Sequence, residues 1–408
     1  MPLFPGVTSD QKKTLTAAAL GWALDAFDVM LYALVLAHVM RDLGMDKPTA
    51  GLLGTLTLLA SGIGGVLFGF IADRIGRTKA LMLSILTYSV CSFGSGLANS
   101  ILVLAIFRFI LGLGMGGEWN TGATLVAETW PVHLRAKALS IVQSSWALGY
   151  AAAALVAGVL LTHYNWRIVF FVGIAPALVI LWIRAKVPES PMWEAHRAAP
   201  PSADQAGFAT IFSPRYIKPT LALLFMNFFG MFAWWGLFTW MPPYLSLPVS
   251  EGGRGFGVMD TTKFLVTLNL VGMFPGYALY GWVADRIGRR LSFILYTAAA
   301  AVLVPIYAQA RSEWAIMVLG VLVAYCGTGF FSGSGIIASE IFPTSVRARA
   351  LGFTYNGARA LSSIAPFVIG YVGQKHGLSG AFYLCAAGFA LSSLVATQIP
   401  ETRGKELD

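Results

Sequence analysis

Five charged residues lie inside long apolar stretches of this 408-residue chain: Asp25, Asp28, Arg108, Glu118 and Arg359. A charged side chain at the centre of a membrane-spanning helix costs at least about 2.5 kcal/mol on insertion scales unless it is paired or faces water. Carboxylates in such places can carry protons, and guanidinium groups can hold anions. These five residues are therefore the first candidates for function.

Asp25 and Asp28 are three residues apart, so both side chains lie on one face of a helix. Two carboxylates this close repel each other, which favours proton uptake by one of them. We therefore predict a proton-carrying site, with Asp28 as the preferred carrier. The alternative is that one or both aspartates pair with an arginine as a packing device.

Arg108 and Glu118 are ten residues apart, which is about 15 Å along a helix, so they cannot pair with each other. The guanidinium of Arg108 fits a carboxylate bidentately and could hold either a first-span aspartate or a substrate anion. Glu118 is either a second protonation site or a structural partner. Both residues are therefore candidates for a proton-coupling network with the two aspartates.

Arg359 is the lone cation within the apolar stretches of the second half of the chain. A carboxylate substrate at the middle of the membrane needs a counter-charge, and transporters place their sites between repeats. We predict that Arg359 binds the substrate carboxylate; a structural or snorkelling arginine is the alternative. Other candidates for the wall of this site are polar and aromatic residues in the apolar stretches, namely Asn356, Asn227, Trp234, Gln143 and Tyr150.

The composition indicates an integral membrane protein, with 57% hydrophobic residues, 12% charged residues and a mean hydropathy of +0.69. Soluble domains carry about 25% charged residues. Glycine within the apolar stretches and the absence of strict alternation favour a helical bundle over a barrel. We predict twelve transmembrane helices, at residues 14–40, 50–72, 79–98, 101–125, 138–162, 167–187, 217–246, 261–284, 291–309, 313–339, 350–374 and 377–399.

The chain repeats itself at an offset of 212 residues. Gly69-Phe-Ile-Ala-Asp73-Arg74-Ile-Gly76-Arg77 returns as Gly281-Trp-Val-Ala-Asp285-Arg286-Ile-Gly288-Arg289. Further pairs keep the same offset: Glu128 with Glu340, Arg135 with Arg347, and Glu189 with Glu401. We therefore predict an N-terminal bundle at 1–187, a linker at 188–216 and a C-terminal bundle at 217–408.

Lysines and arginines are distributed unevenly over the loops, nineteen on one side and seven on the other. Cytoplasmic loops carry the excess, so both termini and the linker are expected inside the cell. The net charge of +9 is thus explained by topology and not by a nucleic-acid partner. Cys91, Cys326 and Cys385 all lie in apolar stretches, and no disulfide framework or metal site follows from them.

The doubled Gly-x-x-x-Asp-Arg-x-Gly-Arg loop, the twelve spans and the central linker resemble the major facilitator superfamily over essentially the whole chain. The resemblance implies two pseudo-symmetric six-helix bundles and a monomer. It also implies that the loop charges latch neighbouring helices on the cytoplasmic side, although they could simply mark topology. The gating residues are then Asp73, Arg77, Glu128, Arg135, Asp285, Arg289, Glu340 and Arg347.

Two stretches, Trp22–Asp28 and Arg108–Trp119, resemble the proton-coupled organic-anion branches of this superfamily. That resemblance implies symport of protons with lactate, pyruvate, sialate or an aromatic acid across the inner membrane, with the proton gradient in place of any cofactor. Alternatives are a sugar porter, a drug or metabolite exporter, and a membrane sensor that moves nothing. An enzyme is not expected, because the sequence has no nucleophile, metal or nucleotide motif.

Overall fold

The computed structural model describes residues 6–198, 208–342 and 344–403, and at some helical positions, Arg347 among them, it describes the backbone alone. This described part contains helices and no β-strand. The helices of the first half are α1 (Ser9–Leu43), α2 (Lys47–Ile75), α3 (Arg77–Gly96), α4 (Ile101–Thr129), α5 (Val132–His163), α6 (Trp166–Val172) and α7 (Ala177–Lys186). Between the halves lie α8 (Pro191–Ala198) and the short helix η1 (Phe208–Phe212). The second half comprises α9 (Ile217–Ser246), η2 (Val249–Glu251), α10 (Val258–Thr267), η3 (Leu268–Met273), α11 (Phe274–Ile287), α12 (Arg289–Gln309), α13 (Glu313–Ile341), α14 (Thr344–Ser362) and α15 (Ala365–Ala396).

The helices of the described residues make twelve passes, as the sequence predicts. Ten stretches in this part of the chain are long and apolar enough to cross a membrane. One of them, Ala350–Ala396, has 47 residues and turns back at Gly377, whose φ of 73° suits glycine, so it crosses twice. α3 adds one more pass, because its 20 residues span about 30 Å.

Some span boundaries differ from the prediction, and prolines explain the breaks. The sixth span, expected to be continuous at 167–187, is split into α6 and α7 by a turn that ends at Pro176. The eleventh span begins at Thr344 instead of residue 350, and it breaks before Pro366. Two short helices, α8 and η1, occupy part of the predicted linker.

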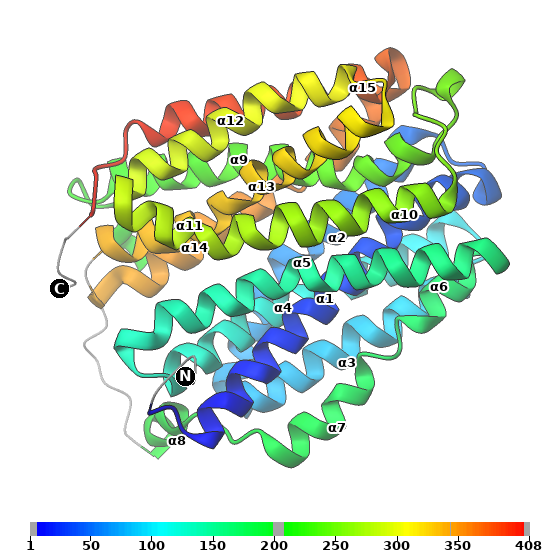
Figure 1. Cartoon of the computed structure of the whole chain (residues 1–408). Coiled ribbons are helices and arrows are strands. Elements are labelled where there is room, and N and C mark those ends of the chain that lie inside the picture. Colours follow the sequence, from blue (N-terminus) through cyan, green and yellow to red (C-terminus); the bar gives the residue numbers. More distant parts are fainter. Residues whose placement is uncertain (1–5, 199–207, 343, 404–408) are drawn as a thin grey trace.

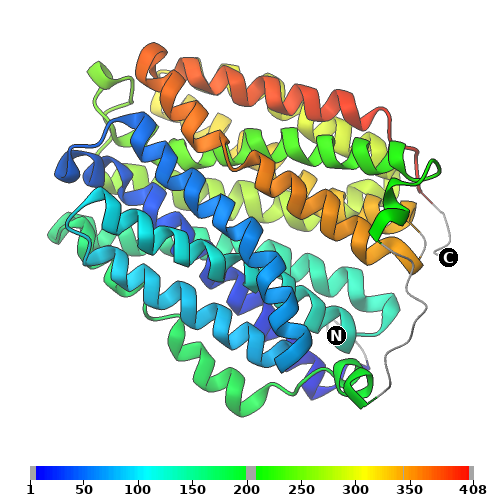
Figure 2. The ribbon, with the colours of Figure 1, turned by 180° about the vertical axis from the view of Figure 1, so that it is seen from behind.

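The two halves of the chain form two bundles that lie side by side (Figures 1 and 2). α1 begins, and α15 ends, at the same end of the molecule, which we call the near end; Arg77 and Arg289 also lie there. The opposite end, where α1 meets α2 at residues 44–46, is the far end. With the predicted orientation, the near end is cytoplasmic.

Contacts between the bundles gather toward the far end. Lys47 Nζ donates to the Glu251 carbonyl at 2.9 Å, and the Phe367 amide donates to Thr55 Oγ1 at 3.3 Å. Gly51 is packed so closely against the Pro366 carbonyl that a Cβ there would overlap it. α5 also lies against α10, since a Cβ at Gly158 would overlap Thr262. This conformation is therefore closed at the far end.

Candidate functional site

The two aspartates predicted to carry protons lie in the interior of the first bundle. Asp25 and Asp28 of α1 are each 1% exposed. Asp28 Oδ1 accepts a hydrogen bond of 2.8 Å from Ser92 of α3. Asp28 Oδ2 and Asp25 Oδ2 have no hydrogen-bond partner in the described part of the chain. Each aspartate thus keeps one carboxyl oxygen without a partner in the bundle interior, and an unpaired buried polar atom is costly.

Arg108 and Glu118 of α4 are buried beside α1 and α2. Arg108 donates from Nε to Thr57 Oγ1 at 3.3 Å, and its guanidinium lies 4.8 Å from the centre of the Tyr32 ring. The described residues place no carboxylate within 4.0 Å of Arg108, so the expected pair with an aspartate is not formed in this conformation. Glu118 packs against Gly21 of α1, and neither of its carboxylate oxygens has a hydrogen-bond partner among the described residues.

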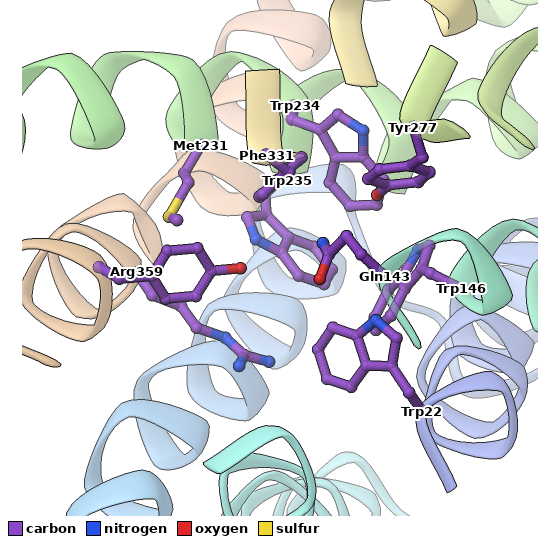
Figure 3. Close-up of a pocket in the computed structure, with 10 residues that line it drawn as sticks. Trp22, Gln143, Trp146, Met231, Trp234, Trp235, Tyr277, Phe331 and Arg359 are labelled. Carbon is purple, nitrogen blue, oxygen red and sulfur yellow. The ribbon is translucent and has the colours of Figure 1, made fainter. Parts of the chain in front are cut away.

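A cavity with about 310 Å³ of empty space lies between the bundles (Figure 3). Its charged residue is Arg359 of α14, which is 4% exposed and whose Nε and Nη2 have no hydrogen-bond partner in the described part of the chain. The remaining lining is mostly aromatic and comes from both bundles: Trp22, Gln143, Trp146, Met231, Trp234, Trp235, Tyr277, Phe331 and Tyr355. Free guanidinium donors thus face flat apolar walls, an arrangement that suits a small anion with an aromatic or conjugated body.

The aromatic walls are packed against one another. The ring centres of Trp22 and Trp146 are 4.7 Å apart, and those of Trp234 and Trp235 are 4.8 Å apart. Trp146 of α5 also meets Trp235 of α9 edge to face at 6.0 Å, so the two bundles touch through indoles. Trp234 is further held by a hydrogen bond from Nε1 to Thr328 Oγ1 of 3.3 Å. The walls therefore form one connected cluster of aromatic rings.

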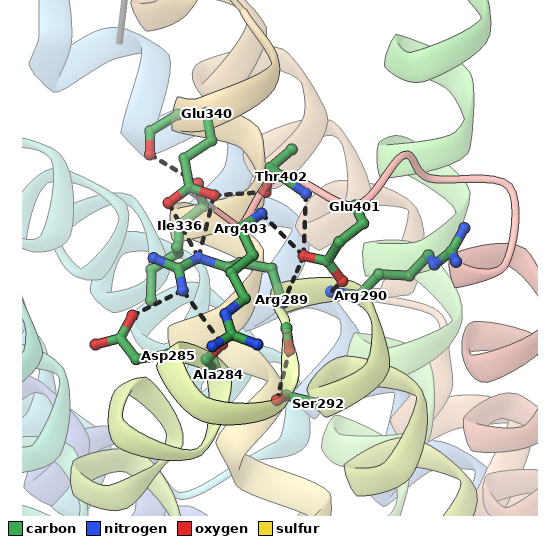
Figure 4. Close-up of polar contacts among 12 residues, drawn as sticks. Ala284, Asp285, Arg289, Arg290, Ser292, Ile336, Glu340, Glu401, Thr402 and Arg403 are labelled. Carbon is green, nitrogen blue, oxygen red and sulfur yellow. Dashed lines mark hydrogen bonds and ion pairs between the residues drawn. The ribbon is translucent and has the colours of Figure 1, made fainter. Parts of the chain in front are cut away.

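At the near end, each bundle carries the same charge network. Arg77 pairs with Asp73 at 2.5 Å and with Glu128 at 3.1 Å, which ties α2, α3 and α4 together. In the second bundle Arg289 pairs with Asp285 at 2.7 Å and Glu340 at 3.2 Å, and Thr402 Oγ1 donates to Glu340 at 2.5 Å (Figure 4). The same arginine–aspartate and arginine–glutamate pairs thus form in both bundles, in agreement with the sequence repeat.

The second glutamate pair of the repeat caps helices. Glu189 accepts from the backbone amide of Arg77 at 2.8 Å, and Glu401 accepts from that of Arg289 at 2.8 Å. Burial opposes ionisation of Glu401, but hydrogen bonds from the backbone amides around it outweigh this cost and lower the pKa of its carboxyl. Each glutamate thus satisfies free amides at a helix start and carries its charge at the positive end of the helix.

Comparison with known proteins identifies the family. The family model described as Major Facilitator Superfamily matches residues 18–259 and 256–407. The chain belongs to the major facilitator superfamily. Among solved structures, a D-xylose–proton symporter aligns over 98% of this chain and 100% of its own with a TM-score of 0.78 and 20% identity. The xylose transporter of E. coli in a partially occluded inward-open conformation gives a TM-score of 0.80 at 17% identity, over 98% of this chain and 100% of its own. These likenesses show the fold alone.

Relatives with stronger sequence similarity are transporters from bacteria. A protein described as a probable 4-methylmuconolactone transporter of Cupriavidus pinatubonensis is 36% identical over 97% of this chain and 91% of its own. A cis,cis-muconate transport protein of Acinetobacter baylyi is 30% identical over 93% and 91%, and a sialic acid transporter of Escherichia coli is 30% identical over 97% and 96%. The protein is accordingly a multi-pass transporter of the inner membrane and not an enzyme, which confirms those two expectations.

The structure brings together half of the predicted substrate-site residues of this facilitator. Arg359, Trp234 and Gln143 line the cavity. The other three do not: Asn227 donates to the Thr354 carbonyl at 3.3 Å, Tyr150 is fully buried elsewhere on α5, and Asn356 is partly exposed on α14. The sequence prediction included Trp234 but missed the other tryptophans of the walls, Trp22, Trp146 and Trp235. The available signal was Trp234-Trp235 in the middle of an apolar span, away from the membrane interfaces where aromatic belts lie.

The gating residues of this facilitator pair within each bundle. Glu128 and Glu340 are held by Arg77 and Arg289, whereas Arg135, a suggested partner of Glu128, leaves its Nε without a hydrogen-bond partner among the described residues. The side chain of Arg347 lies outside the described residues. The latch role of these charges stays a prediction.

Proposed function

We propose that this facilitator is a proton-coupled symporter that takes up a small planar monocarboxylate by alternating access. The observation that carries the proposal is the buried Arg359, with free donors on Nε and Nη2, at the edge of a cavity walled by indole, phenol and phenyl rings. A carboxylate supplies the two acceptors that the guanidinium fork needs. A flat conjugated body then stacks against the rings.

The charge of the lining favours a monoanion. Arg359 is the one cation among the described residues that line the cavity, and the lining contains no carboxylate. A second carboxylate on the substrate would therefore be buried without a counter-charge in this cavity, at a cost of several kcal/mol. Two relatives are named for other acids, sialic acid and cis,cis-muconate. We therefore use the residues that line the cavity, and not the relatives, to choose among organic anions as substrates.

A sugar is a poor fit to the same lining. A hydroxyl-rich substrate needs many positioned hydrogen-bond partners, because each buried hydroxyl left unpaired costs about 1–3 kcal/mol. Apart from Arg359, the lining offers the amide of Gln143, two tyrosine hydroxyls and indole N–H groups amid apolar rings. The likeness to the xylose–proton symporter, at 20% identity, shows the fold alone.

Proton coupling rests on the buried acids of the first bundle. Asp25 and Arg359 interact electrostatically across the bundle interface, so protonation of Asp25 frees the guanidinium for a substrate carboxylate. Asp28 and Arg108 interact electrostatically within the first bundle, as do Glu118 and Asp25. We assign the proton to Asp25 and Asp28, with Glu118 as a further protonation site. Downhill proton influx then drives anion uptake.

The test is uptake of labelled acids into proteoliposomes with and without an inward proton gradient. We expect nicotinate and benzoate to accumulate when the gradient is present, whereas lactate, sialate and xylose do not. Protein-free liposomes control for passive diffusion of the neutral acids. Accumulation of xylose but of no acid would refute the proposal. Accumulation of an acid only when the proton gradient is directed outward would show exchange of the anion for a proton, and therefore export from the cell.

A further inference from the structure

A second cavity, with about 280 Å³ of empty space, lies between α1, α2, α4 and α9. Its charged residue is Arg108, which is 1% exposed. Nε of Arg108 donates to Thr57, but Nη1 has no hydrogen-bond partner in the described part of the chain. A buried guanidinium with an unused donor beside empty space has the chemistry of an anion site.

Trp235 separates this cavity from the one that holds Arg359. It is the residue that lines both cavities. Figure 3 shows its indole near the centre of the first cavity, next to Trp234. Trp235 is thus the one residue that the two linings share.

The second cavity lies next to the closure of the far end. Gly54 lines it and packs against Pro366, while Thr239 of α9 lines it from the other bundle. Pro366 also packs against Gly51, and Phe367 donates to Thr55. The order along the bundle interface is therefore the far-end closure, the Arg108 cavity, Trp235 and the Arg359 cavity.

The two cavities repeat one arrangement of charges. Each has a buried arginine, and each arginine has an aspartate of α1 within electrostatic range: Asp28 for Arg108 and Asp25 for Arg359. An arginine with only a packing role would have its donors satisfied by fixed partners, because an unmet buried donor is costly. Arg108 has instead a hydroxyl, a ring face and free space.

We propose that the Arg108 cavity is a second binding station for the substrate carboxylate. The anion occupies this station on its way between the far end and the Arg359 cavity. Movement of the Trp235 side chain connects the two cavities. The inference rests on the proposed function, since it needs an organic monocarboxylate as cargo. Asp28 is the carboxyl group of α1 within electrostatic range of Arg108 at this station. Transfer from one arginine to the next keeps the anion paired with a cation along the interface.

The experiment is equilibrium dialysis of labelled benzoate against the full-length protein in detergent, without any proton gradient. We expect Arg359→Gln to bind benzoate about tenfold more weakly than the unsubstituted protein. Some binding should remain, because the Arg108 station is still present. Adding Arg108→Gln should abolish the residual binding, whereas adding Arg108→Lys should retain it. Lys263→Gln in the same background, which removes an exposed cation at the far end, should leave it unchanged. Gel filtration confirms that each variant is folded.

Two results would overturn the proposal that the Arg108 cavity is a second binding station. One is complete loss of binding in Arg359→Gln alone, and the other is equal binding in Arg359→Gln with and without Arg108→Gln. Failure of the proposed function gives a different result, because the original chain would then bind no benzoate at all. Loss of residual binding with Arg108→Gln and its survival with Arg108→Lys and Lys263→Gln supports the second station.

Discussion

The two bundles are alike at the near end and different in the middle of the membrane. Arg77 with Asp73 and Glu128 in the first bundle matches Arg289 with Asp285 and Glu340 in the second, contact for contact. Among the described residues of the interior, the first bundle buries two aspartates, an arginine and a glutamate, while the second buries a single arginine. We infer from the proposed function that the repeated charges serve the transport cycle itself, and that the unrepeated ones determine the substrate and the coupling ion.

The largest effect that sharpens this contrast is expected at Arg359. Replacement by Gln removes the charged donors that face the cavity, so the affinity for nicotinate should fall about tenfold to one hundredfold, as expected for a lost charge-assisted hydrogen bond. Arg359→Lys should fall less, because it keeps the charge but loses the fork. Binding is measured by equilibrium dialysis, and unchanged affinity for every transported acid would remove Arg359 from the site.

Intermediate and equal effects are expected at the two near-end networks. Glu128→Gln and Glu340→Gln each weaken one ion pair whose side chains are 14–17% exposed, so each should lower the transport rate several-fold and leave affinity unchanged. Double-mutant cycles with Arg77→Gln and Arg289→Gln should give similar coupling energies, about 1 kcal/mol each. A large coupling in one bundle and none in the other would break the symmetry on which the comparison rests.

The smallest effect is expected at the helix caps. Glu189→Gln and Glu401→Gln keep the size of the side chain but remove the charge at the start of α3 and α12. Each should lower the free energy of unfolding by about 0.5–1 kcal/mol, with equal shifts of the melting temperature in the two variants. Ser190→Ala, at the neighbouring position, serves as a control for changes in the connecting segment. A shift confined to one glutamate would show that the caps are not equivalent.

The fold could be predicted because its signals are strong and local. Long apolar stretches, the doubled loop at Asp73 and Asp285, and the excess of loop cations all follow from what a bilayer allows. The breaks in the sixth and eleventh spans were missed, although Pro176 and Pro366 mark both. Proline breaks are tolerated inside spans when neighbouring helices satisfy the freed backbone groups, so a proline alone does not reveal whether a span is interrupted.

The charged residues of the candidate site could be predicted from the sequence, but most of its aromatic residues could not. Arg359 and Asp25 stood out because a charge in an apolar stretch is expensive, whatever its surroundings. Most of the aromatic walls did not stand out, because a tryptophan carries no charge that a membrane span would have to neutralise. The convergence of Trp22, Trp146 and Trp235 from three helices depends on how the bundles pack, and this information is not local in the chain.

The central claim is that an acid of the first bundle couples the proton to an anion held by the second. The direct test is nicotinate uptake by proteoliposomes containing Asp25→Asn, with Asp260→Asn, an exposed aspartate at the far end, as the matched control. We expect Asp25→Asn to lose nicotinate accumulation driven by an inward proton gradient but to keep nicotinate counterflow, whereas Asp260→Asn keeps both. Gradient-driven accumulation by Asp25→Asn at the level of the unsubstituted protein would contradict the central claim.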